Sequence, residues 1–167
     1  MGRDWQRWLR HAFWPRARLE RAFPVQSLKA IEDAIGVSEA THSGEIRVVI
    51  EGALDPQDAW AGKTPRARAI EVFARLGVWD TEANNGVLIY LLLADRDVEI
   101  VADRGLNGRV SAEEWSAVCA TMEGLLRSGH YERGAVEAVQ AVGALLARHY
   151  PPLPGGRDEL PNRPAVI

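Results

Sequence analysis

The sequence predicts a single α/β domain with α/β/α layers, in which a mixed sheet contains a βαβ unit and an antiparallel hairpin. Residues 45–51 are rich in β-branched side chains, residues 87–93 form an apolar run, and a helical pattern lies between them. This order is typical of a βαβ unit with two parallel strands. Residues 98–103 alternate between apolar and polar side chains and follow the second strand after a short turn, so we expect an antiparallel partner there.

The composition is that of one globular domain. The chain has 167 residues, of which 47% are hydrophobic and 26% are charged, which is enough to bury a core of ordinary size. The formal net charge of −3 gives no reason to expect a protein that binds nucleic acid. Cys119 is the only cysteine, which excludes a disulfide framework and a cysteine-based zinc site and agrees with a reducing compartment. We therefore expect a cytoplasmic protein.

Residues 1–24 are predicted to form a basic amphipathic arm. Residues 1–23 hold six arginines against two acidic residues, and their apolar side chains recur on one face of a short helix that ends at Pro15. One interpretation is a surface that contacts a protein partner or lies peripherally on anionic lipid at the inner face of the membrane. The other is an arm folded onto its own domain. The residues predicted for this surface are Trp5, Trp8, Phe13, Arg7 and Arg10.

No segment has the pattern of a secretion signal or of a membrane span. Arginine recurs every three or four residues near the N-terminus, so this part lacks the uninterrupted apolar core of a signal peptide. The longest apolar run, residues 87–94, is far shorter than the roughly 20 residues that cross a bilayer.

The predicted domain covers residues 25–150, and its first helix is expected at residues 27–41 with a cap at Ser27. The linker after the first strand ends in GKT, like a phosphate-binding loop, but Gln57 stands where such a loop needs a glycine. We therefore interpret Thr64 as a helix cap followed by a proline at the first helical position. The buried stripe of this crossover helix is predicted to be Ile70, Phe73, Ala74 and Gly77.

Two further helices complete the predicted domain. Ser111 and Glu114 have the spacing of a capping box and begin a helix that ends at Gly129. The last helix stops at Pro151. Residues 151–167 are rich in proline and glycine, so we expect a flexible tail.

Several segments occur in the order found in TPM domains. They are SGEIRVVIE at residues 43–51, LGVWDTEANNGVLIYLLLADRDVEIVADRGLNG at residues 76–108, and LRSGHYERGAVEAVQAVGALL at residues 126–146. On these segments the chain resembles a soluble bacterial branch of the TPM domain family, also called TPM phosphatase domains, over about residues 25–150. The resemblance implies a mixed sheet between helical layers, which agrees with the fold predicted from periodicity.

The resemblance also implies a site before the second strand. In TPM domains, an aspartate or asparagine followed by Asn-Gly lies at one end of the sheet near a glycine loop, and some members bind divalent cations or show weak acid phosphatase activity. Carried over to this chain, the cofactor would be Ca²⁺ or Mg²⁺, which prefer amide and carboxylate oxygens. The implied metal ligands are Asn84, Asn85 and Asp103, and the loop residues are Gly86, Gly105 and Gly108.

The alternative is that this corner is only a turn. Asn85 and Gly86 would then supply backbone that tolerates a left-handed conformation, and Asp103 would cap a turn. Either way, Asn84 and Asp103 are expected at the same end of the hairpin, whereas Asp95 lies on the turn at the opposite end.

The residues by themselves do not indicate an enzyme. No nucleophile elbow and no HExxH motif are present, and the four histidines are scattered without ligand spacing. We therefore expect a non-catalytic binding or regulatory module that acts through a protein partner or the membrane surface. The alternative is a weak acid phosphatase that depends on a divalent cation.

Overall fold

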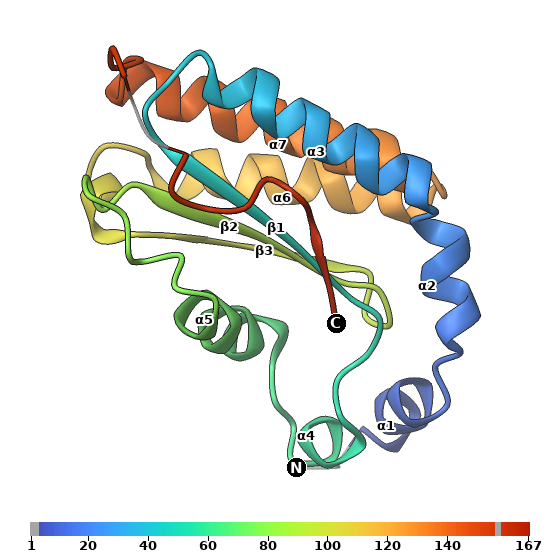
Figure 1. Cartoon of the computed structure of the whole chain (residues 1–167). Coiled ribbons are helices and arrows are strands. Elements are labelled where there is room, and N and C mark those ends of the chain that lie inside the picture. Colours follow the sequence, from blue (N-terminus) through green and yellow to red (C-terminus); the bar gives the residue numbers. More distant parts are fainter. Residues whose placement is uncertain (1–3, 156–157) are drawn as a thin grey trace.

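Seven α-helices and a four-stranded sheet make up the computed structural model, which describes residues 4–155 and 158–167 (Figure 1). In chain order the elements are α1 (Trp5–Ala12), α2 (Arg16–Ala22), α3 (Val25–Glu39), β1 (Glu45–Glu51), α4 (Pro56–Trp60), α5 (Pro65–Arg75), β2 (Gly86–Leu92), β3 (Asp97–Ala102), the 3-10 helix η1 (Arg104–Leu106), α6 (Ala112–Arg127), α7 (Tyr131–His149) and β4 (Ala165–Val166). None of the described helices is long and apolar enough to cross a membrane.

The sheet has the strand order β3-β2-β1-β4 and is mixed, as predicted. β1 and β2 are parallel, with Glu45 opposite Gly86. β3 runs antiparallel to β2, with Leu92 opposite Asp97. α5 lies in the connection between the parallel strands, so the predicted βαβ unit and hairpin are both confirmed.

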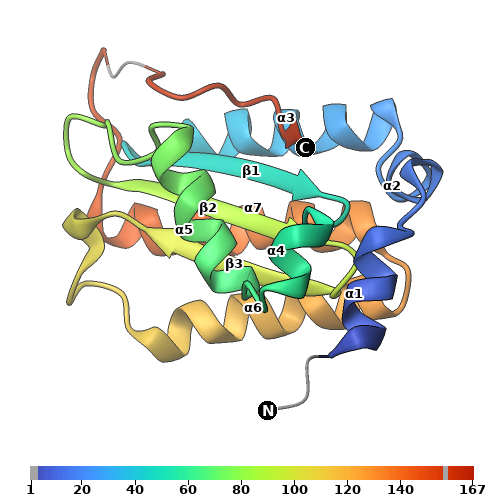
Figure 2. The same cartoon turned by 90° about the horizontal axis from the view of Figure 1, so that it is seen from below.

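Helices cover both faces of the sheet, with α3, α6 and α7 on one face and α5 across the other (Figures 1 and 2). Every residue of β2 is buried, because its alternate side chains point into two covered layers. Val87, Ile89 and Leu91 belong to the core shared with α3, α6 and α7. Leu88 and Tyr90 belong to the core on the α5 side.

The predicted helix starts at Thr64 and Ser111 are confirmed. The Thr64 hydroxyl oxygen accepts a hydrogen bond from the backbone N–H of Ala67 at 3.1 Å. Ser111 and Glu114 form both hydrogen bonds of a capping box, with lengths of 3.2 and 2.9 Å. These side chains satisfy backbone N–H groups that have no partner within the first helical turn.

The first predicted helix boundary is wrong. α3 begins at Val25, directly after Pro24, because the fixed φ of proline suits the start of a helix. Ser27 is therefore inside the first turn, where its buried hydroxyl donates to Glu132 at 2.6 Å. A short helix, α4, also occupies part of the predicted linker, with Asp55 as its N-cap.

The face of α5 that was predicted to be buried is wrong, because a different face of the helix packs against the sheet. Ile70 is 49% exposed and Ala74 is also exposed, whereas Ala69 and Val72 are buried against the sheet. Phe73 is half-buried and packs on the same core. The small side chain of Ala69 allows the helix to approach the sheet closely, and this choice of face depends on the packing surface rather than on the apolar pattern.

Residues 158–167 pack against the sheet, so the flexible tail predicted for residues 151–167 is wrong for this part. Leu160 is 7% exposed, and Arg47 of β1 donates a hydrogen bond to the carbonyl oxygen of Pro161 at 2.7 Å. β4 then pairs in parallel with the outer edge of β1. A strand at the edge of a sheet tolerates nearby prolines, because only one of its sides must supply hydrogen bonds.

Candidate cation site

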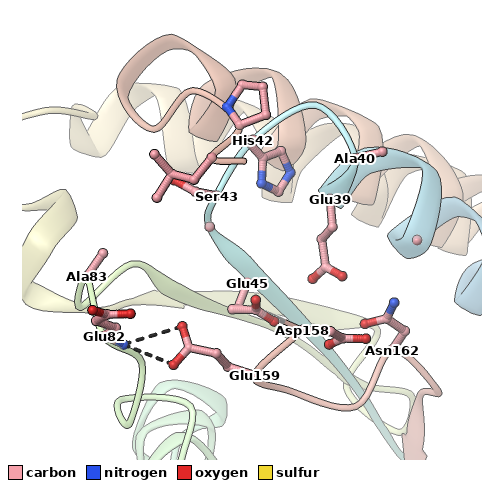
Figure 3. A pocket seen from close by; sticks show the side chains of 14 residues that line it. Glu39, Ala40, His42, Ser43, Glu45, Glu82, Ala83, Asp158, Glu159 and Asn162 are labelled. Atoms are coloured by element: carbon pink, nitrogen blue, oxygen red, sulfur yellow. Dashed lines mark hydrogen bonds between the residues drawn. The ribbon is translucent and has the colours of Figure 1, made fainter. Parts of the chain in front are cut away.

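A pocket with a volume of about 670 Å³ lies where β1 begins, between the C-terminal end of α3, the loop before β2 and the C-terminal segment (Figure 3). Among the described residues that line it there is no lysine and no arginine. The lining includes five carboxylates, which belong to Glu39, Glu45, Glu82, Asp158 and Glu159. The wall of the pocket is therefore strongly acidic.

Three of these carboxylates converge. Glu39, Glu45 and Asp158 each offer an oxygen atom, and the three oxygens lie within 4.8 Å of one another. Glu39 is the last residue of α3 and Glu45 the first residue of β1, while Asp158 comes from the C-terminal segment. Carboxylates this close repel one another when all are ionised, and a cation between them would remove the repulsion.

Burial changes the acidity of two of the three groups. It raises the pKa of Glu39 to about 8, although the carboxylate accepts a hydrogen bond from the N–H of Ile46 at 2.9 Å. It raises the pKa of Glu45 to about 7, against the hydrogen bond that Glu45 accepts from the N–H of Leu160 at 3.1 Å. The negative charge of Asp158 raises both further.

Asn162 adds a neutral oxygen to the same wall. Its Oδ1 atom is buried and accepts no hydrogen bond from the residues that the structure describes. The side chain lines the pocket, and Figure 3 shows it next to Asp158. A buried amide oxygen without a donor is costly, and a cation is one partner that would satisfy it.

None of the three metal ligands predicted at the start of β2 lines the acidic pocket. Asn84 adopts the left-handed conformation, with a φ of 51°, so Asn84, and not Asn85 as the turn interpretation had it, supplies this backbone. The Oδ1 atom of Asn84 accepts a hydrogen bond from Arg104 Nε at 2.9 Å, and its carbonyl accepts one from the N–H of Gly105 at 2.9 Å. Asn84 thus joins the two loops at this end of the hairpin.

Asn85 is completely buried and connects the start of β2 to the start of β1. Its side-chain amide donates to the carbonyl of Ser43 at 2.9 Å, and its own carbonyl accepts from the N–H of Glu45 at 3.4 Å. Its Oδ1 atom is buried and has no hydrogen-bond partner among the described residues. Asn85 therefore helps to position the strand that carries Glu45, behind the acidic pocket.

Asp103 caps the 3-10 helix η1, as its Oδ1 atom accepts from the N–H of Arg104 at 2.7 Å. Its Oδ2 atom is buried and has no hydrogen-bond partner among the described residues. The hairpin end brings the backbones of Asn84 and Asp103 together, as expected, because the N–H of Gly105 donates to Asn84 and that of Asp103 donates to Gly86. Metal binding by Asn84, Asn85 and Asp103 stays a prediction.

The loop glycines are needed for close packing. A Cβ atom on Gly86 would lie 2.0 Å from the carbonyl oxygen of Val78, and one on Gly105 would lie 2.4 Å from the carbonyl oxygen of Asn84. Gly108 has a φ of +72°, which only glycine adopts readily. Gly86 does not have a positive φ, so it does not supply the left-handed backbone that the turn interpretation assigned to it, and close packing is what requires a glycine there.

The charged residues of the predicted N-terminal surface are bound to the domain itself. Arg7 donates to Asp95 through Nε at 3.0 Å and Nη2 at 2.8 Å, and Arg10 donates to the same carboxylate at 3.0 Å. His11, which the apolar pattern did not indicate, is buried and also contacts Asp95 at 3.0 Å. The arm therefore folds onto its own domain, and Arg7 and Arg10 do not form a free basic face.

The aromatic residues of the arm divide into two groups. Trp8 packs edge-on against Trp60 of α4, with ring centroids 5.7 Å apart. Trp5 and Phe13 are 58% and 73% exposed. The contact with lipid or a protein partner predicted for this surface stays a prediction for Trp5 and Phe13 only.

The fold and the residue pattern agree with a known family. The family model described as TPM domain matches residues 20–145. The chain belongs to the TPM domain family. No curated protein matches the chain.

Solved structures of similar proteins share this TPM fold. The BA42 protein from the psychrophilic bacterium Bizionia argentinensis is 32% identical, with a TM-score of 0.76, and the match covers 87% of this chain and 95% of that one. The N-terminal domain of a P. gingivalis protein is 21% identical, with a TM-score of 0.60 and coverage of 81% and 90%. The N-terminal domain of cg2496 from Corynebacterium glutamicum is 15% identical, with a TM-score of 0.54 and coverage of 73% and 72%. The last two similarities concern the fold only.

The residues of the acidic pocket could not be found from the sequence. Glu39 and Glu45 lie close together in the chain, but Asp158 is more than 100 positions away, and the three follow no ligand spacing. Asp158 and Asn162 also belong to the segment that was expected to be a tail. The only sequence signal was Glu45 at the start of a strand that is rich in β-branched residues.

Proposed function

We propose that this TPM domain is a non-catalytic binding module that holds a divalent cation in its acidic pocket. The observation that carries the proposal is the convergence of Glu39, Glu45 and Asp158, whose oxygens lie within 4.8 Å of one another. The buried Oδ1 atom of Asn162 supports it, because this atom has no donor among the described residues. All four groups are oxygen ligands, which hard divalent cations prefer.

The ligand set favours Ca²⁺ over Mg²⁺. Ca²⁺ takes about six to eight oxygen ligands in a flexible geometry, whereas Mg²⁺ demands a nearly ideal octahedron and keeps several of its waters. Ligands from three separate segments also suit the flexible geometry of Ca²⁺ better than the octahedron of Mg²⁺.

Electrostatics argue against phosphatase as the principal role. The five carboxylates of the pocket, with no lysine or arginine among the described lining residues, would repel a phosphate ester. A phosphatase would need the cation to be bound first and to leave an open position for the substrate. Weak acid phosphatase activity therefore remains the second candidate, and any such activity should disappear with a chelator.

Calorimetric titration with CaCl₂ at pH 8 tests the proposal, with Glu45→Gln as the principal variant. The glutamine keeps an oxygen for the N–H of Leu160 but removes a buried charge, so the variant should be folded and at least as thermally stable as the wild type in EDTA. We expect its affinity for Ca²⁺ to fall at least tenfold. Glu113→Gln, a change on an exposed acid outside the pocket, should leave the affinity unchanged.

Two results would overturn the proposal. One is the absence of saturable binding by the wild type at millimolar Ca²⁺. The other is an equal loss of affinity in the Glu45→Gln and Glu113→Gln variants, which would mean that the ion responds only to net charge. Activity on a phosphate ester that survives EDTA would place any phosphatase chemistry outside this pocket.

A further inference from the structure

A second pocket, with a volume of about 580 Å³, lies at the opposite end of the sheet, where β2 ends. It is lined by the residues that follow β2, by the N-terminal arm and by Tyr131 of α7. Its charged and aromatic lining consists of Arg10, Arg18, Arg21, Arg96, Asp95, Trp14 and Tyr131. Four arginines therefore face one concave site.

We propose that this arginine pocket binds a small molecule that carries phosphate groups. Guanidinium groups donate paired hydrogen bonds in a planar geometry that matches phosphate oxygens. The volume lies within the range of small-molecule sites, about 300 to 1,000 Å³. The position also fits, because ligands of open α/β sheets bind beyond the carboxyl ends of the parallel strands.

The single carboxylate of the pocket does not cancel its positive charge. Asp95 is already hydrogen-bonded by Arg7, Arg10 and His11, with distances between 2.8 and 3.0 Å. The Nδ1 atom of His11 accepts from the N–H of Leu54 at 3.0 Å, so Nε2 carries the proton that is donated to Asp95. Asp95 thus fixes the arm in place, and the remaining arginines stay available to a ligand.

Three arginines of the pocket have no carboxylate partner among residues 4–155 and 158–167. The guanidinium of Arg18 lies over the ring of Trp14, 5.2 Å from its centroid, which orients this group. The Nε atom of Arg21 donates a hydrogen bond to the carbonyl oxygen of Ala17 at 3.2 Å, and its two terminal nitrogens remain available to a ligand. Arg96 uses none of its side-chain donors within this described part of the chain.

The backbone at Arg96 is unusual for an arginine. Its φ is 53°, a left-handed conformation that glycine or asparagine adopts at lower cost. The turn between β2 and β3 would therefore be more stable with glycine at this position. Binding of a phosphate group by its guanidinium would explain why an arginine occupies this position, since Arg96 lines the pocket.

Calorimetry with inorganic pyrophosphate at 0.15 M salt tests the assignment. The Arg96→Gly variant removes one guanidinium and relieves the backbone, so its melting temperature should be equal or higher while its affinity for pyrophosphate falls at least tenfold. Arg16→Gln is the matched control, because Arg16 lies on α2 outside the pocket, is 91% exposed and pairs with Glu20. This control should bind pyrophosphate like the wild type.

The outcomes separate the possible sources of the phosphate group. The assignment is overturned if the wild type shows no saturable binding of pyrophosphate, or if Arg16→Gln loses as much affinity as Arg96→Gly. Equal binding of sulfate at the same ionic strength would reduce the site to a general anion site. Binding of phosphatidic acid vesicles without binding of soluble phosphates would replace the small molecule by a lipid headgroup. Because this pocket is distinct from the acidic pocket, neither proposal depends on the other.

Discussion

The carboxylate of Glu39 accepts a hydrogen bond from the backbone N–H of Ile46 at 2.9 Å, and this contact joins the end of α3 to the start of β1. It holds Glu39 beside Glu45, the residue that precedes Ile46. Two acidic side chains are thereby kept close together by the fold itself. The repulsion between the two carboxylates should lower the free energy of unfolding, by an amount that depends on pH and on bound cations.

Without metal, the free energy of unfolding should fall as the pH rises from about 5 to about 9. The pKa values of Glu39 and Glu45 are about 8 and about 7 in the folded protein, whereas an unfolded glutamate titrates near 4.3. Between these values the folded state binds more protons than the unfolded state, so raising the pH favours unfolding. One pKa unit corresponds to about 1.4 kcal/mol, and partial exposure reduces the effect to about 1 to 3 kcal/mol.

Urea unfolding in EDTA at pH 5, 7 and 9 measures this effect. The Glu39→Gln variant should lose the part of the pH dependence that comes from Glu39 and keep the part that comes from Glu45, and saturating Ca²⁺ should restore the stability of the wild type at high pH. A wild type whose stability rises steadily over this range would contradict the raised pKa values.

Calcium affinity should distinguish the acidic pocket from the corner at Asn84 and Asp103. Asp103→Ala removes a cap of η1 and should reduce stability by about 1 kcal/mol, but it should leave the affinity for Ca²⁺ within a factor of two. Glu45→Gln should weaken binding at least tenfold. Titration calorimetry on both variants gives the answer, and the reverse ranking would move the cation site to the corner predicted from the sequence.

Bound calcium at the proposed cation site should also reduce local unfolding of the C-terminal segment. Two of its ligands, Asp158 and Asn162, would join that segment to Glu39 and Glu45. We expect Ca²⁺ to slow hydrogen exchange at the amides of Leu160 and Ile167, which donate to Glu45 and to the carbonyl of Ile50. The Asp158→Asn variant should lose this protection, while amides in β2 should not change in either protein.

A buried charged network under α5 should contribute strongly to stability. Arg68 donates to both carboxylate oxygens of Glu51, at 2.9 and 3.0 Å, and Tyr90 donates to Glu51 at 2.6 Å. Arg68→Leu would leave the buried carboxylate without its cation and should cost about 2 to 4 kcal/mol. Tyr90→Phe removes one neutral donor and should cost about 1 kcal/mol. Denaturant unfolding at pH 7 tests this order, which would be wrong if Tyr90→Phe were the more damaging change.

The N-terminal arm should detach when its anchor loses charge. Asp95→Asn weakens the contacts with Arg7, Arg10 and His11, so we expect faster hydrogen exchange throughout α1 and a loss of about 1 to 3 kcal/mol. Glu20→Gln, a change on an exposed acid of α2, is the control and should leave α1 protected. Unchanged exchange in α1 of Asp95→Asn would show that apolar contacts such as that of Trp8 suffice to hold the arm.

Local patterns in the chain determined most of the architecture. Three segments were sufficient to predict the mixed sheet: the β-branched run at residues 45–51, the apolar run at residues 87–93 and the alternating residues after it. The burial of a strand can be recognised from the spacing of its apolar side chains. The caps at Thr64 and Ser111 were also predictable, since a cap depends only on residues within one helical turn. The family resemblance rested on these same local segments.

Only the tertiary structure decided the two pockets. Glu39, Glu45 and Asp158 converge because α3, β1 and the C-terminal segment meet at one end of the sheet, and no spacing in the sequence records that meeting. In the same way, the contacts of Asp95 with the arm join residues more than 80 positions apart. Secondary structure depends on neighbours along the chain, so it can be predicted from the sequence alone. The convergence of distant side chains depends on packing between elements, which only the tertiary structure shows.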